Sequence, residues 1–158
     1  MPTLTQWILL LHVLAAVWLA AGAFAGAVVR AQGKRASDLA GKVFALRTGW
    51  RLSVLFGVPG SIVAGATGLW LLDPLGYGFK PGWVHASIGL WALLLGIHLA
   101  WGLPRLKRTV AAAEASLASG APSVELQKLV SSKAPGIVAD VSALGIVVLI
   151  ALMVLKPF

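Results

Sequence analysis

Four ionisable side chains that could do chemistry lie inside long apolar stretches of the sequence: His12, His85, His98 and Asp140. Ionisable groups in such stretches usually face other protein groups and have a function. The chain has no Cys, and no acidic cluster accompanies the His residues. A zinc hydrolase site therefore lacks a third ligand and a base, and a serine-type site lacks an orienting acid. Imidazole binds haem iron and a porphyrin is otherwise apolar, so haem ligation fits these residues best.

The depth of each His below the nearest interfacial Trp predicts which of them could share one iron. At 1.5 Å per helical residue, His12 lies about 7 to 8 Å below Trp7, and His85 lies about 3 Å below Trp83. His98 lies about 22 Å below Trp83 by the same rise. We therefore predict His12 and His85 as the iron ligands. A pair of His12 and His98 would need a shift of two to three helical turns.

Each of these residues also has a simpler interpretation. His85 at an interface can be a hydrated surface residue, and His98 can hydrogen-bond a backbone carbonyl of a neighbouring helix. Asp140 lies near the end of an apolar block, where a salt bridge to a basic loop residue is expected. The functional alternative for Asp140 is a proton acceptor.

The elements that must position these residues are four apolar blocks, at about 5–29, 52–72, 83–103 and 137–155. Each is close to the 20 residues that a membrane-spanning helix needs, and the alternating pattern of spanning strands is absent. Hydrophobic residues make up 59% of the 158 residues and charged residues only 11%, more apolar surface than a soluble domain could cover. The sequence predicts an all-α fold, with residues 1–158 forming one transmembrane domain, a bundle of four helices. Because residues 1–6 carry no Lys or Arg, we interpret the first block as a retained helix rather than a signal peptide.

The connections between the blocks differ sharply in charge. Residues 30–51 and 105–133 hold eleven Lys and Arg, whereas the middle connection has only Asp73 and Lys80. The positive-inside rule places the two basic connections in the cytoplasm and both termini outside, in a bacterial-type cytoplasmic membrane. Because the net charge of +8 adjoins apolar spans, it sets topology, and we expect no nucleic-acid partner. Aromatic residues mark the same edges: Trp7, Trp70, Tyr77 and Trp83 outside, Trp50 and Trp101 inside.

Small residues and Pro59 predict how the helices meet. The second block carries two rows of small residues, Gly57–Ser61–Gly65 and Gly60–Ala64–Gly68, and the first block carries Gly22 and Gly26. Such rows let helices approach closely in lipid, so we expect the second helix to be central. Pro59 should kink it. For the two basic connections we expect solvated, membrane-skimming segments, with residues 43–51 extending the second span inward as a basic interfacial turn and short helices near 109–117 and 123–130.

Two segments resemble a known family, the small membrane-bound protoporphyrinogen IX oxidases. The residues that carry the resemblance are His12, Trp18, Gly22 and Arg30 in the first segment, and Gly82-Trp83-Val84-His85, His98 and Arg105 in the second. The chain is similar as well to predicted membrane proteins of unknown function and to the membrane domain of copper-resistance protein D. The likeness covers about two-thirds of the chain.

The resemblance implies a four-helix membrane fold, bound haem b with His12 as the matching ligand, and a membrane oxidoreductase that removes electrons from protoporphyrinogen. One position departs from the pattern, because the oxidases carry Lys where this chain has Ser87. A Lys there could meet a substrate propionate, and Ser cannot supply that charge. The resemblance therefore supports fold and haem better than the reaction.

Three functions remain open from the sequence. The first is a haem-b-binding, redox-active membrane protein. The second is a cofactor-free accessory subunit of a larger membrane complex or of a homo-oligomer, which would suit the small size and the scarcity of polar residues. The third is copper handling, against which two Met and no Cys argue.

Overall fold

A computed structural model describes all residues, 1–158, and it is helical throughout without strands. The segments in chain order are α1 (Leu4–Arg35), α2 (Leu39–Leu52), η1 (Ser53–Gly57), α3 (Val58–Leu71), α4 (Gly82–Ile97), η2 (His98–Gly102), α5 (Leu103–Ser119), α6 (Val124–Ser131) and α7 (Ala134–Leu155). Because η1 and η2 are π-helical turns, α2 to α3 and α4 to α5 form two continuous helices. Four helices are long and apolar enough to cross a membrane, as the sequence predicted.

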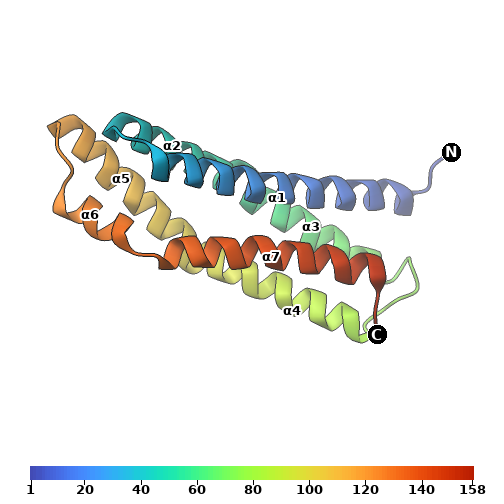
Figure 1. The fold of residues 1–158 in the computed structure, drawn as a ribbon. Helices are drawn as coiled ribbons and strands as arrows, with labels where there is room; N and C mark the ends of the chain where they lie inside the picture. Colours follow the sequence, from blue (N-terminus) through green and yellow to red (C-terminus); the bar gives the residue numbers. More distant parts are fainter.

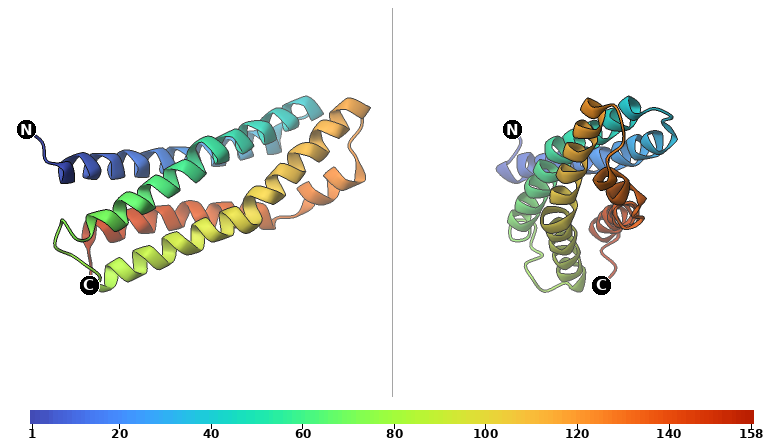
Figure 2. Two further views of the ribbon diagram at one scale, coloured as in Figure 1. Left: turned by 180° about the vertical axis from the view of Figure 1, so that it is seen from behind. Right: turned by 90° about the vertical axis from the view of Figure 1, so that its left-hand side faces the viewer.

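The four long helices form a loose bundle with both termini at one end (Figure 1). Helix α1 packs along α3, α4 packs along α7, and the two pairs meet through α3 with α4 and α1 with α7. Figure 2 shows α5 and α6 at the end opposite the N- and C-termini. We call these two ends the termini end and the cap end.

Three of the long helices extend well beyond a bilayer. Their lengths are 32, 33 and 38 residues, about 48, 50 and 57 Å at 1.5 Å per residue, whereas hydrocarbon is about 30 Å thick. At the cap end the second and third of these helices project as α2 and α5. Together with the separate short helix α6 they form what we call the cap. The expectation that residues 43–51 extend the second span is confirmed, because α2 continues α3 outward as one helix. Helix α5 continues α4 in the same way, so the third connection begins as an extension of a span rather than as a separate loop.

The cap has its own apolar core. Val43 of α2 packs with Ala112 and Ala113 of α5 and Leu126 of α6, and these side chains are buried. Ser123 begins α6, where its hydroxyl accepts from the Leu126 N–H at 3.1 Å.

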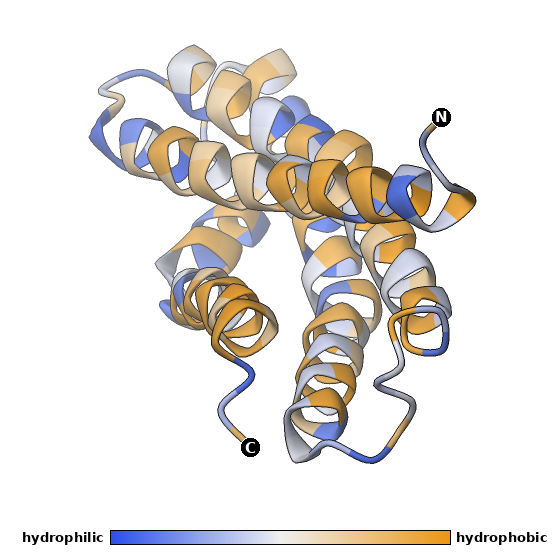
Figure 3. Ribbon diagram, turned by 90° about the vertical axis from the view of Figure 1, so that its right-hand side faces the viewer, coloured by the Kyte–Doolittle hydropathy of each residue, from blue (hydrophilic) through white to orange (hydrophobic).

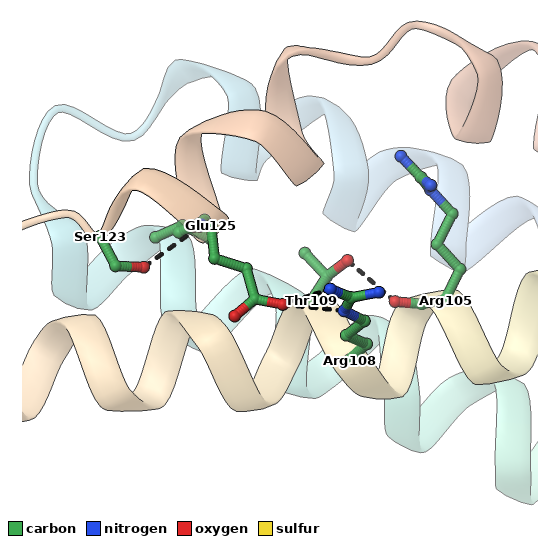
Figure 4. A network of polar contacts seen from close by, with 6 residues as sticks. Arg105, Arg108, Thr109, Ser123 and Glu125 are labelled. Atoms are coloured by element: carbon green, nitrogen blue, oxygen red, sulfur yellow. Dashed lines mark hydrogen bonds and ion pairs between the residues drawn. The ribbon is translucent and has the colours of Figure 1, made fainter.

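Ion pairs join the cap helices. Arg47 of α2 donates from Nε to Glu114 of α5 at 2.5 Å, and Arg108 of α5 donates to Glu125 of α6 at 2.8 Å (Figure 4). Together with the apolar core, these ion pairs make the two basic connections one packed unit.

Two wide turns separate the cap from the spans. The Val58 N–H donates to the Ser53 carbonyl, and the Leu103 N–H donates to the His98 carbonyl, each five residues back. Each turn ends two residues before a proline, in the related sequences Phe56-Gly57-Val58-Pro59 and Trp101-Gly102-Leu103-Pro104. Proline has no N–H to donate and crowds the preceding turn, so the wider turn relieves both problems. Where we expected a kink at Pro59, the structure has a π-helical turn in a continuous helix.

The small-residue rows of α3 face two different neighbours. A Cβ at Gly60 would lie 3.0 Å from the backbone nitrogen of Leu19 in α1, whereas one at Gly65 would lie 2.2 Å from the Trp91 ring in α4. Helix α3 is therefore central, as predicted. Elsewhere the helices present apolar residues outward, and Figure 3 shows hydrophobic residues on all sides of α7.

Candidate functional site

His12 lies in the interface between α1 and α3, about two turns from the start of α1. Its Nδ1 lies 2.9 Å from the Ala64 carbonyl oxygen and 3.1 Å from Thr67 Oγ1. The ring is half-buried and lies on Gly68, where a Cβ would be 2.9 Å from Cε1. Only a glycine at position 68 leaves room for this ring.

The partners of His12 determine which ring nitrogen carries the proton. The Ala64 carbonyl can only accept, so Nδ1 is the donor. Thr67 already donates its hydroxyl proton to the Val63 carbonyl at 2.6 Å, which leaves its oxygen free to accept from His12. With the proton on Nδ1, the lone pair of His12 is on Nε2, the arrangement that orients His ligands in metal and haem sites.

Ser87 is a second polar group, and the packing of α4 on α3 brings it near the level of His12 along the bundle. It lies one turn nearer the termini end than Trp91, whose Nε1 donates to the Ser61 carbonyl at 3.0 Å. Since α4 runs antiparallel to α3, Ser87 falls near the level of Thr67 and Gly68. The side chain is 6% exposed, and its buried hydroxyl has no hydrogen-bond partner.

His85 points away from this region. It is exposed, and its Nδ1 lies 3.3 Å from the Pro81 carbonyl of its own first turn. His85 precedes the buried Ser87 by two positions, and two steps of about 100° place the two side chains about 200° apart around the helix. They therefore leave α4 on opposite sides. The depths of His12 and His85 match, but the structure does not bring their rings together.

His98 lies beside the cap-side end of α3, whereas His12 lies beside its end nearer the termini. It begins the π-helical turn η2, and its Nε2 lies 3.6 Å from where a Cβ of Gly57 would be. This nitrogen is buried without a hydrogen-bond partner, so the carbonyl partner considered from the sequence is not present at Nε2.

The three His residues therefore occupy three separate environments. His12 contacts Gly68 and His98 contacts Gly57, which are eleven residues apart, about 16 Å along the helix. No group of three His, Asp or Glu residues gathers in the structure to hold a metal ion. His12 and His85 each have Nδ1 against a backbone carbonyl and no hydrogen-bond partner at Nε2, but only His12 is half-buried between two helices.

Two site residues were not singled out from the sequence. Thr67 and Gly68 position the ring of His12, and the only signal was a hydroxyl beside a glycine in an otherwise apolar span. That signal becomes specific only when the structure shows that His12, 55 positions earlier in the sequence, packs against Thr67.

Asp140 forms an ion pair with Arg30, which joins α7 to α1 at the cap end. The carboxylate side chain is 69% exposed and the Arg side chain 30%. The predicted salt bridge between Asp140 and a basic residue is confirmed. It joins two spanning helices, α1 and α7, through residues that are 110 positions apart in the sequence.

Comparison with known proteins gives one match. No curated protein and no solved structure matches the chain. A family model described as "Predicted integral membrane protein (DUF2269)" matches residues 6–157, which covers all four long helices and the cap. The chain therefore belongs to the DUF2269 family of predicted integral membrane proteins.

Proposed function

We propose that this integral membrane protein binds haem b, and that Nε2 of His12 would be the protein's ligand to the iron. The single observation that carries the proposal is the pair of contacts from His12 Nδ1 to the Ala64 carbonyl and the Thr67 hydroxyl. A backbone carbonyl on one imidazole nitrogen fixes the ring and makes the other nitrogen a better ligand.

The other residues near this site suit the same group. Gly68 lets the imidazole lie against the backbone of α3, and the surrounding helices present apolar side chains suited to a porphyrin. The Ser87 hydroxyl, buried and without a partner, is a polar group that a bound haem could use. His85 and His98 are turned elsewhere, so the proposal assigns one protein ligand rather than two.

Haem would supply one-electron chemistry in the membrane, and the chain itself would supply orientation and exclusion of water. Thr67 holds the proton of His12 on Nδ1, and the α1–α3 interface keeps that nitrogen away from water. Residues 5–29, the span that contains His12, have no Asp, Glu, Lys or Arg. This span therefore adds no second ionisable group beside the iron ligand.

The test is the absorption spectrum of the protein purified after haem-replete expression, with haem quantified per chain. We expect a Soret band in the unmodified protein, and its loss in His12→Ala. His12→Gln is the matched variant, since its amide can still donate to the Ala64 carbonyl but is a poor iron ligand. His85→Ala and His98→Ala should keep their haem, and Thr67→Val should keep it with a shifted spectrum.

Two outcomes would overturn the proposal. One is a well-folded, monodisperse protein with no Soret absorption, which would promote the cofactor-free accessory subunit and leave His12 as a helix-to-helix hydrogen bond. The other is full haem content in both His12 variants, which would move the ligand elsewhere.

A further inference from the structure

A groove runs between α2 and α5 on the side of α5 that faces away from α6. It has a volume of about 210 Å³ and is lined by Trp50, Lys107, Val110, Ala111 and Glu114. The four α5 residues occupy positions i, i+3, i+4 and i+7 of one helix face, and Trp50 closes the groove from α2. The apolar core of the cap uses another face of α5, so the partners of this face within the chain are Trp50 and, through its ion pair with Glu114, Arg47 of α2.

The groove lies at the depth of lipid headgroups. The spans begin near Leu71 and Trp83 at the termini end, and about 20 residues cross the hydrocarbon. The cap-side edge of the hydrocarbon then falls near Leu52 and Leu103. Trp50 lies two residues beyond this edge and Lys107 four, about 3 and 6 Å at 1.5 Å per residue.

The lining combines one free cation with an apolar wall. Glu114 is neutralised by Arg47, which donates to it from Nε at 2.5 Å. Lys107 has no acidic partner, because the ion pairs of the chain join Arg30 to Asp140, Arg47 to Glu114 and Arg108 to Glu125. Val110, Ala111 and the indole of Trp50 form the rest of the surface, and indole favours the half-hydrated interfacial layer.

The charge of the whole chain favours an anionic occupant at this level. Of the 13 basic residues, only Lys80 and Lys156 lie at the termini end, and of the five acidic residues only Asp73 does. The excess positive charge therefore surrounds the cap and the membrane edge beside it. Juxtamembrane Lys and Arg bind anionic lipid with about 1 kcal/mol for each cation near the surface.

We propose that the α2–α5 groove binds an anionic phospholipid of the cap-side leaflet, with the glycerol backbone beside Trp50, the phosphate at Lys107 and the outer part of the headgroup against Val110 and Ala111. The groove holds a headgroup rather than a whole lipid, since 210 Å³ equals the liquid volume of only about seven waters at about 30 Å³ each. The acyl chains then continue along the apolar surface of the spans. This site is independent of His12 and of any haem.

The test is lipid retention by the full chain, reconstituted in vesicles of phosphatidylglycerol and phosphatidylcholine, extracted in mild detergent and measured by native mass spectrometry. Lys107→Gln should lower the retained phosphatidylglycerol about fivefold, the equivalent of about 1 kcal/mol at 25 °C. Lys128→Gln is the matched control, because it removes the same charge from an exposed position on α6. Ala111→Phe fills the groove without changing charge, and should also displace the lipid.

Equal losses in Lys107→Gln and Lys128→Gln would overturn the proposal, since they would show attraction to the whole basic surface. Full retention in Ala111→Phe would overturn it as well, because the groove would then not be the binding site. Displacement by inorganic phosphate as effective as by phosphatidylglycerol would identify a free-phosphate site and reject the lipid.

Discussion

The indole of Trp91 lies directly on the backbone of Gly65, and a Cβ at that glycine would come within 2.2 Å of the ring. The same ring donates from Nε1 to the Ser61 carbonyl at 3.0 Å and reaches the Ser61 hydroxyl at 3.1 Å. Trp91 is therefore the main link between α3 and α4, because it combines close packing with a hydrogen bond to the backbone of a spanning helix.

Any side chain at Gly65 should displace Trp91. We expect Gly65→Ala to destabilise the protein by about 1 to 3 kcal/mol, and Gly65→Leu to do so more than Leu69→Ala, since overpacking moves the ring and its hydrogen bond. The measurement is thermal unfolding of the detergent-solubilised protein. Gly89→Ala is the control, because no atom lies within 4 Å of its Cβ position. Equal melting temperatures for Gly65→Ala and Gly89→Ala would contradict the packing role.

The ion pair between Arg30 and Asp140 should contribute little to stability. Its carboxylate is 69% exposed, and exposed pairs usually contribute between 0 and about 1 kcal/mol. We expect Asp140→Asn to lower the unfolding midpoint by no more than a few degrees, similar to Glu125→Gln in the cap. A collapse of the fold in Asp140→Asn alone would show that this carboxylate has a role beyond joining α1 to α7.

The basic cap should lie in the cytoplasm, with both termini on the other side of the membrane. Single cysteines at Thr3, Gly78 and Ser119 provide the test, because the natural chain has none. In intact cells, an impermeant thiol reagent should label positions 3 and 78 and spare position 119, which becomes reactive after lysis. Labelling of position 119 without labelling of position 78 would reverse the orientation.

Ser87 should prevent efficient oxidation of protoporphyrinogen. The resembling oxidases carry Lys at this position, and a cation about 4 Å from a propionate gains roughly 4 kcal/mol at an effective dielectric of about 20, before desolvation. Of the two cations at the termini end, Lys156 is held on the Tyr77 hydroxyl and Lys80 lies in the connection between α3 and α4.

We therefore expect no rescue when this chain is expressed in a cell that lacks its own protoporphyrinogen oxidase. Rescue by Ser87→Lys alone would mean that the scaffold is shared and the charge is the missing part. Full rescue by the unmodified chain would show that the Lys is dispensable.

The four spans could be predicted because each is a long apolar run, and lipid allows few alternatives to a helix. The ends of two cap helices could also be predicted. Gly120, with φ +75°, follows the last residue of α5, and Ser123 is the N-cap residue of α6. What could not be read was the cap itself. The packing of Val43 against Ala113 joins positions 70 residues apart, and helix patterns do not specify which faces meet.

The candidate site could be predicted only in part, because it too depends on which helix faces meet. His12 stood out as an ionisable residue in an uncharged span, but its tautomer depends on Ala64 and Thr67 from another helix. Position along the helices could be estimated, since the rise per residue is constant. Direction around them was harder, because His85 shares the depth of His12 yet leaves α4 on the outer side.

The π-helical turns make two of the long helices, α2 to α3 and α4 to α5, levers that pivot near the cap-side membrane edge. Helix α5 extends 17 residues beyond η2, about 25 Å, so a rotation of about 5° at the turn would move its far end by about 2 Å. The core around Val43 binds α2 to α5, so the two arms beyond their fulcrums must swing together. A force applied to the cap is thereby converted into torque on α3 and α4, the two helices that meet where Trp91 rests on Gly65.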